Sequence, residues 1–100
     1  MLDIKPYETK IKKICANLRL KNLALFGSAI TDRFGQESDI DILVEFNLQG
    51  NENLFNTYFT LKEQLEELFH RPVDIVMERS VKNPFLKRVI DATKKNIYAG

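Results

Sequence analysis

The amino-acid sequence predicts an α/β (α+β) domain in which helices flank a small three-stranded mixed sheet. This prediction rests on three observations: short apolar runs, amphipathic stretches between them, and a modest chain length. The chain has 100 residues, of which 44% are hydrophobic. A chain of this size removes roughly two-thirds of its unfolded surface from water, which is enough for one core. We therefore expect residues 1–100 to form a single domain.

Three apolar runs predict the strands, at about residues 23–26, 39–46 and 73–76. The connection between the first two strands is tight, so the end of one and the start of the next meet at one edge, as in antiparallel neighbours. A helical crossover joins the second strand to the third, which predicts parallel neighbours. The second strand has a period of two, so Asp39 and Asp41 point to the same face.

Apolar residues at helical spacing predict four helices. They cover about residues 6–19, 29–34, 54–69 and 84–94. The stretch 54–69 is amphipathic, with its Glu cluster largely off the apolar face, and we interpret that cluster as solvated rather than as a metal site. His70 follows at the helix end, where a capping or surface role is the simpler interpretation.

The charge balance and the cysteine content argue against several classes of protein. The chain carries 15 basic and 14 acidic residues, for a net charge of +1, so we expect neither direct nucleic-acid binding nor membrane binding. The single Cys15 cannot form an internal disulfide, and it is interpreted as a small core residue rather than a nucleophile. No apolar stretch approaches a membrane span or a signal-peptide core, so we expect a cytoplasmic protein.

Two acids one residue apart, Asp39 and Asp41, stand where a hydrophobic segment begins. Placing both there is costly unless a cation lies between them. Magnesium takes one or two carboxylates and completes its shell with water and substrate phosphates. Gly27 allows close backbone approach, and Ser28 can cap a following helix whose free N–H groups attract an anion. This pattern predicts a metal site and a phosphate site at one edge of the sheet.

A third carboxylate, Asp74, lies near the start of the predicted third strand. That strand begins at the edge where the second strand also begins, so Asp74 is expected beside the first two acids. The alternative is a polar residue that only alternates in an exposed strand. Arg33 also has two interpretations, because it could reach a triphosphate or pair with Asp32 or Glu37 on the surface.

Gly27-Ser28, ten intervening residues and then Asp39-Ile40-Asp41 before an apolar run resemble the nucleotidyltransferase motif of the DNA polymerase β superfamily. The whole chain is similar to the MNT (minimal nucleotidyltransferase) proteins that are encoded beside HEPN-domain toxins. This resemblance implies the nucleotidyltransferase fold. It also agrees with Asp74, because the third acid of the family follows a helix in such a strand.

The resemblance implies transfer of AMP from ATP to a hydroxyl by two-metal catalysis. Asp39 and Asp41 would bind two Mg²⁺ ions, and Asp74 would complete one metal site and accept the acceptor proton. The residues expected to contact the nucleotide are Gly27, Ser28, Arg33 and Ser38.

No acceptor-binding domain is expected in this chain, so a partner must present the hydroxyl. Similarity to the MNT proteins implies that the partner is a HEPN toxin, whose tyrosine is AMPylated and whose RNase activity is silenced. Two alternatives stay open: a non-catalytic antitoxin that binds the toxin directly, and a small-molecule adenylyltransferase that works as a homodimer. The apolar residues within 85–98 are the expected partner-binding surface.

Overall fold

A computed structural model describes residues 3–27, 39–47 and 54–99, and the structural statements below concern these residues. The elements follow one another as α1 (Glu8–Asn17), β1 (Leu20–Phe26), β2 (Ile40–Phe46), α2 (Leu54–Phe69), β3 (Val73–Met77), the 3₁₀ turn η2 (Glu78–Ser80), α3 (Pro84–Thr93) and β4 (Lys95–Ala99). The helix predicted at 29–34 lies outside the described residues.

The strands form one mixed sheet in the order β3-β2-β1-β4. β1 is antiparallel to β2 and to β4, whereas β2 and β3 are parallel. The neighbours predicted from the two connections are therefore confirmed. The predicted count of three strands was wrong, because β4 adds a fourth at the free side of β1. Its sequence, KNIYA, buries only Ile97, and long-range pairing with β1 stabilises it as a strand.

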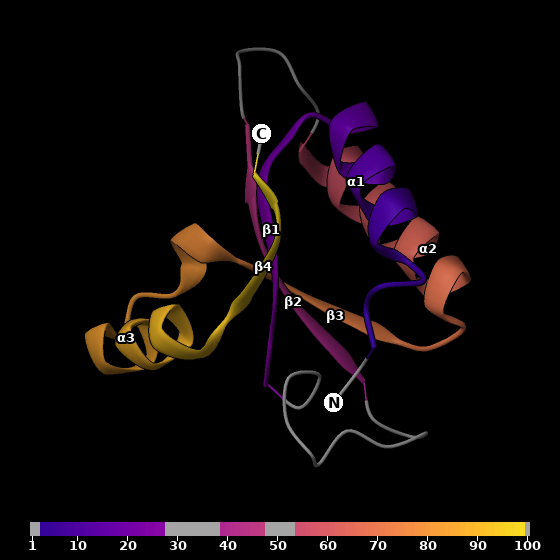
Figure 1. Ribbon diagram of the computed structural model, residues 1–100. Helices are drawn as coiled ribbons and strands as arrows, with labels where there is room; N and C mark the ends of the chain where they lie inside the picture. Colours follow the sequence, from indigo (N-terminus) through magenta and orange to yellow (C-terminus); the bar gives the residue numbers. More distant parts are fainter. Residues whose placement is uncertain (1–2, 28–38, 48–53, 100) are drawn as a thin grey trace.

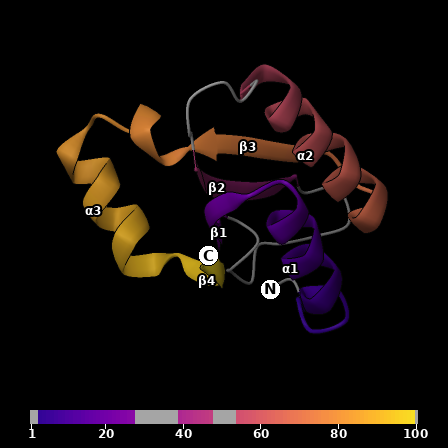
Figure 2. The same ribbon diagram turned by 90° about the horizontal axis from the view of Figure 1, so that it is seen from above.

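Helices cover the two faces of the sheet unequally (Figure 1). α1 and α2 lie side by side on one face, and α3 lies on the other, as the view from above also shows (Figure 2). The larger core is on the α1/α2 face, where Leu23, Ile42 and Leu65 pack together. The smaller core on the α3 face contains Ala24, Leu43 and Ile90. This division follows from the period of two in each strand, which sends alternate side chains to opposite faces.

The predicted helix bounds are close to those observed. α2 covers residues 54–69 as predicted, α1 is shorter than the predicted 6–19, and α3 ends one residue before the predicted 94. α3 begins at Pro84 after Asn83, whose side-chain oxygen accepts from the backbone N–H groups of Phe85 and Leu86 at 2.9 and 3.3 Å. An N-cap of this kind typically contributes about 1 kcal/mol. Within the described residues, no helix has both the length and the apolar character needed to cross a bilayer.

Cys15 lies in the larger core, where its side chain is 0% exposed. Burial raises the pKa of its thiol from the ordinary 9.0 to about 12. The neutral thiol is therefore the form that the folded protein favours, and at neutral pH Cys15 is neither a nucleophile nor a metal ligand.

We expect Cys15 to resist a thiol reagent such as DTNB at pH 8 in the native protein and to react fully in denaturing urea. Because the folded pKa is above the unfolded one, the free energy of unfolding should fall as pH rises from 9 towards 12. The Cys15→Ala variant is the control, since it lacks the only cysteine of the sequence. Rapid stoichiometric labelling of the native protein would contradict this burial.

Candidate functional site

Four of the predicted site residues, Gly27, Asp39, Asp41 and Asp74, lie at the edge of the sheet where β1 ends and β2 and β3 begin. Phe26, the last residue of β1, pairs with Asp41 in the antiparallel register. Asp41 pairs in turn with Asp74 in the parallel register of β2 and β3. Asp39 immediately precedes β2. Three neighbouring strands therefore bring Gly27, Asp41 and Asp74 together from distant parts of the sequence.

Asp41 and Asp74 are on the α3 face of the sheet. The neighbours of Asp41, Ile40 and Ile42, are buried in the core under α1 and α2, as are the neighbours of Asp74. Since successive side chains of a strand alternate, both carboxylates belong to the opposite face. Asp41 is half-buried and Asp74 is exposed. Asp74 therefore lies beside Asp41 at the edge where both strands begin, and the shared face predicted for Asp39 and Asp41 stays a prediction.

Gly27 lies directly against the Asp41 carboxylate. A Cβ built on Gly27 would overlap Asp41 Oδ2 and lie 3.2 Å from Asp41 Cγ. The backbone of Gly27 also has φ +67°, a conformation that side chains with a Cβ rarely adopt. The backbone conformation therefore favours glycine at the end of β1, and the Asp41 carboxylate occupies the space that a Cβ would fill.

The acids offer hard oxygen ligands, which suit Mg²⁺. Among residues 3–27, 39–47 and 54–99, however, no three His, Cys, Asp or Glu side chains are grouped closely enough to hold a metal ion. The Asp41/Asp74 pair fits the usual magnesium arrangement, in which one or two carboxylates bind and substrate phosphates complete the shell. The metal-binding role of Asp39, Asp41 and Asp74 stays a prediction, as do the contacts of Ser28, Arg33 and Ser38, which lie outside the described residues.

The α3 face also carries a hollow between β1, β2, η2 and β4, with a volume of about 240 Å³. Its lining is mixed, with amide, charged and apolar groups: Asn22, Ala24, Leu43, Glu78, Lys94, Asn96 and Ala99.

Two α2 side chains, Glu66 from the cluster expected in solvent and Lys62 one turn before it, contact the strand that carries Asp74. Glu66 Oε2 accepts the backbone N–H of Val73 at 2.9 Å, and Lys62 Nζ donates to the Val73 carbonyl. The Val73 N–H, followed by the charge of Lys62, lowers the pKa of Glu66 below its ordinary value of 4.5. The spacing of four residues between Lys62 and Glu66 was the available signal, but it is equally typical of a surface ion pair.

A mixed sheet that carries paired aspartates at one edge beside a glycine bend is the architecture of a nucleotidyltransferase. The family model described as polymerase beta, nucleotidyltransferase, matches residues 9–99. The chain therefore belongs to the polymerase β nucleotidyltransferase family.

Similar proteins of known sequence point to one branch of that family. MJ1379 of Methanocaldococcus jannaschii, assigned as a protein adenylyltransferase, is 39% identical over 90 residues, which are 89% of each chain. The protein adenylyltransferase MntA of Thermococcus cleftensis is 32% identical over 79 residues, which are 79% of this chain and 77% of MntA.

Solved structures share the fold over nearly the whole chain. A structure described as a minimal nucleotidyltransferase is 27% identical, with a TM-score of 0.73 over 95% of this chain and 91% of its own. A toxin–antitoxin structure with AMP-PNP is 25% identical, with a TM-score of 0.69 over 94% and 74%. The complex of a tri-AMPylated Shewanella oneidensis HEPN toxin with its MNT antitoxin gives 25% identity and a TM-score of 0.60, over 93% and 70%.

The contact between Gly27 and Asp41 predicts the effect of Gly27→Ala. The new Cβ must displace the Asp41 carboxylate, and the left-handed backbone adds strain, so we expect a loss of about 1–3 kcal/mol in the free energy of unfolding. Urea denaturation measures this loss.

The same substitution in an Asp41→Ala background separates the two causes. The steric part should disappear there and only the backbone strain of about 1–2 kcal/mol should remain. An equal loss in both backgrounds would show that Asp41 does not fill the space beside Gly27.

Proposed function

We propose that this chain transfers AMP from ATP to a tyrosine hydroxyl of a HEPN toxin, and so acts as an antitoxin in the cytoplasm. The register that puts Asp74 beside Asp41, next to Gly27, carries this proposal. The relatives assigned as protein adenylyltransferases and the tri-AMPylated toxin in one similar structure support the reaction and the acceptor. We further propose that residues 1–100 act as one catalytic domain.

Each residue at the sheet edge has a role in this reaction. Asp39 and Asp41 would hold two Mg²⁺ ions, and Asp74 would complete one of the two sites. The chemistry that bound Mg²⁺ supplies is neutralisation of the triphosphate and in-line placement of the attacking and leaving oxygens. Gly27 leaves room for Asp41 and, with Ser28, contacts the β and γ phosphates. Arg33 and Ser38 are proposed as further nucleotide contacts.

The reaction exchanges one phosphorus–oxygen bond for another. The tyrosine oxygen attacks the α-phosphorus of ATP, the bond to the β-phosphate bridging oxygen breaks, and pyrophosphate leaves. The tyrosine proton passes to an Asp74 carboxylate oxygen and then to water. The exposure of Asp74 suits this role, because an acceptor from another protein must reach it.

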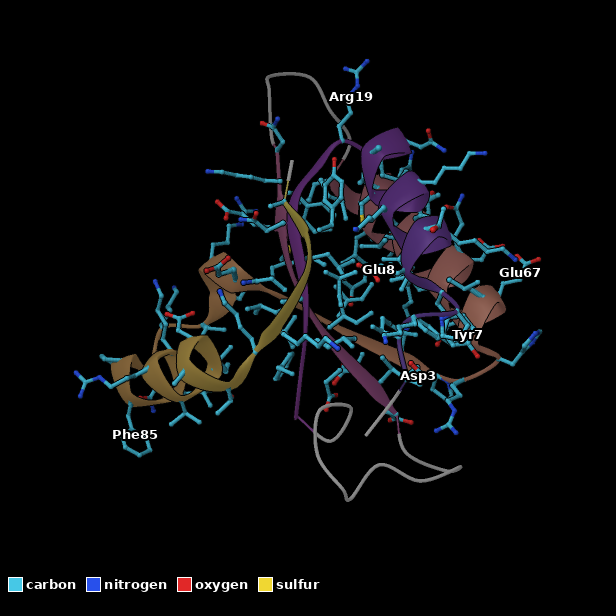
Figure 3. All side chains as sticks on the ribbon, viewed as in Figure 1. Asp3, Tyr7, Glu8, Arg19, Glu67 and Phe85 are labelled. Carbon is cyan, nitrogen blue, oxygen red and sulfur yellow. The ribbon has the colours of Figure 1, made fainter. Side chains whose placement is uncertain are left out.

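The partner is proposed to bind the apolar side of α3. Phe85, Leu86 and Val89 are 75%, 48% and 43% exposed, and Phe85 projects away from the sheet (Figure 3). α3 covers the same face that carries Asp41 and Asp74, so a partner seated on α3 approaches the acids from the correct side. Exposed apolar side chains grouped on one helix are typical of a protein-binding surface.

The same surface supports the second candidate function, a non-catalytic antitoxin. Apolar contacts through α3 would suffice to block a toxin without any chemistry at the acids. Loss of the acids distinguishes the two functions, because only the catalytic antitoxin depends on them.

We expect intact mass spectrometry to detect AMP additions on the HEPN protein after incubation with this chain, ATP and Mg²⁺. Asp39→Ala combined with Asp41→Ala should slow the transfer at least about 100-fold, because several kcal/mol of charge stabilisation are lost. Glu63→Ala combined with Glu67→Ala is the matched control, since it removes two exposed carboxylates on α2. A double aspartate variant that still neutralises the toxin in cells would favour the non-catalytic antitoxin.

The partner surface predicts that Phe85→Asp weakens binding to the HEPN protein at least about tenfold, measured by calorimetry, because it places a charge in an apolar contact. The melting temperature should hardly change, since Phe85 is exposed. Phe55→Asp is the control: Phe55 is 69% exposed but lies on α2, across the sheet. Equal weakening by both substitutions would argue against α3 as the binding face.

A further inference from the structure

We propose that Lys62 and Glu66 of α2 are positioning residues that grip the backbone of Val73 and thereby hold Asp74 level with Asp41. This inference rests on the proposed function, because it assigns Asp74 to the reaction. We call Lys62, Glu66 and the Val73 peptide groups the edge clamp.

The edge clamp lies on the free side of β3. β3 is the outer strand next to β2, so half of its backbone groups have no strand to pair with. The Ile40 N–H donates to the Pro72 carbonyl at 3.1 Å, which turns the groups of residues 72 and 74 towards β2. Since these groups alternate along a parallel strand, the N–H and C=O of Val73 face away from β2.

α2 supplies partners for both outward groups of Val73. Glu66 accepts the N–H at 2.9 Å, Lys62 donates to the carbonyl, and the two side chains form an ion pair at 3.5 Å. One turn away, the Tyr58 hydroxyl donates to the Ile75 carbonyl at 3.5 Å. The spacing of four residues along α2 thus follows the edge of β3. Hydrogen bonds to charged groups are stronger than neutral ones, so the peptide units before and after the Val73 Cα are both held by α2.

The position of Val73 fixes that of Asp74, to which it is directly bonded. The Val73 side chain is 1% exposed in the core, and its backbone is hydrogen-bonded to α2. The residue that precedes Asp74 is therefore held through both its side chain and its backbone. By contrast, Lys12 and Glu8 form an ion pair of the same spacing on α1, 52% and 42% exposed. That pair provides a natural comparison for the edge clamp.

These contacts have a simpler alternative role. They could only cover the outer edge of β3 and so prevent it from pairing with a strand of another molecule. A role limited to edge protection predicts that variants change stability or aggregation but leave the chemical step intact. A positioning role predicts a selective loss of turnover that does not follow stability.

The test uses Glu66→Ala, Glu66→Gln and Lys62→Met in the full chain. Hydrogen exchange measured by NMR should show the Val73 amide exchanging about ten- to a hundredfold faster in Glu66→Ala, because a charge-assisted hydrogen bond is lost. Glu66→Gln keeps an acceptor oxygen and should retain most of the protection. The amide shifts of Asp74 and Asp41 should move in Glu66→Ala and stay in place in Glu66→Gln.

The kinetic arm measures AMP transfer to the HEPN protein with the same variants. Glu66→Ala and Lys62→Met should lower kcat about 10- to 100-fold with KM for ATP within about twofold, and Glu66→Gln should restore kcat. Glu8→Ala combined with Lys12→Met removes the comparison ion pair, and Ile11→Val destabilises the core of α1. Neither control should change kcat.

Unchanged exchange at Val73 and unchanged shifts at Asp74 in Glu66→Ala would overturn the edge clamp itself. Faster exchange with an unchanged kcat would overturn the positioning role and leave edge protection. If the wild-type chain transfers no AMP, the proposed function fails, and the NMR arm still decides whether Glu66 sets the place of Asp74. The two failures are thus distinguishable.

Discussion

Parallel pairing between β2 and β3 puts two carboxylates on adjacent strands of one sheet face, although like charges repel there. The pairing holds because Val73 and Ile75, on either side of Asp74, are 1% and 6% exposed in the core. A slip of one residue would turn both into solvent and Asp74 into the core, which makes the register strongly specified. Burial of apolar side chains on one face of the sheet thus keeps the two carboxylates together on the other face. Gly27 leaves the space that the Asp41 carboxylate occupies.

Local patterns predicted most of the fold. The helix at 54–69 was exact because a long amphipathic stretch leaves little choice, and the strand directions followed from the lengths of the connections. β4 was missed because Lys95–Ala99 buries only Ile97, so its strand character comes from β1. Pairing between segments so distant in sequence leaves no local pattern to detect.

The positions of Asp41 and Asp74 were predicted better than the contacts of the residues around them. The edge at which β2 and β3 both begin was enough to predict that Asp74 lies beside Asp41. Gly27 was expected to make room for phosphate, whereas in the structure the space that its missing Cβ leaves is next to Asp41 Oδ2. Glu66 was assigned to solvent because its role depends on how α2 lies along β3, which a single helix sequence does not specify. Side chains that bind backbone atoms carry little sequence signal of their own.

Among the three α-helices of the described residues, α3 buries the fewest side chains. Ile90 is its single buried residue, and its ends continue into η2 and into β4. A helix with so few buried contacts opens at low free-energy cost, so in isolated protein this segment is a natural place for a protease to cut first. A bound partner that shields Phe85 and Val89 would supply the missing support, and protection from cleavage there would then report occupancy of the surface without any assay of chemistry.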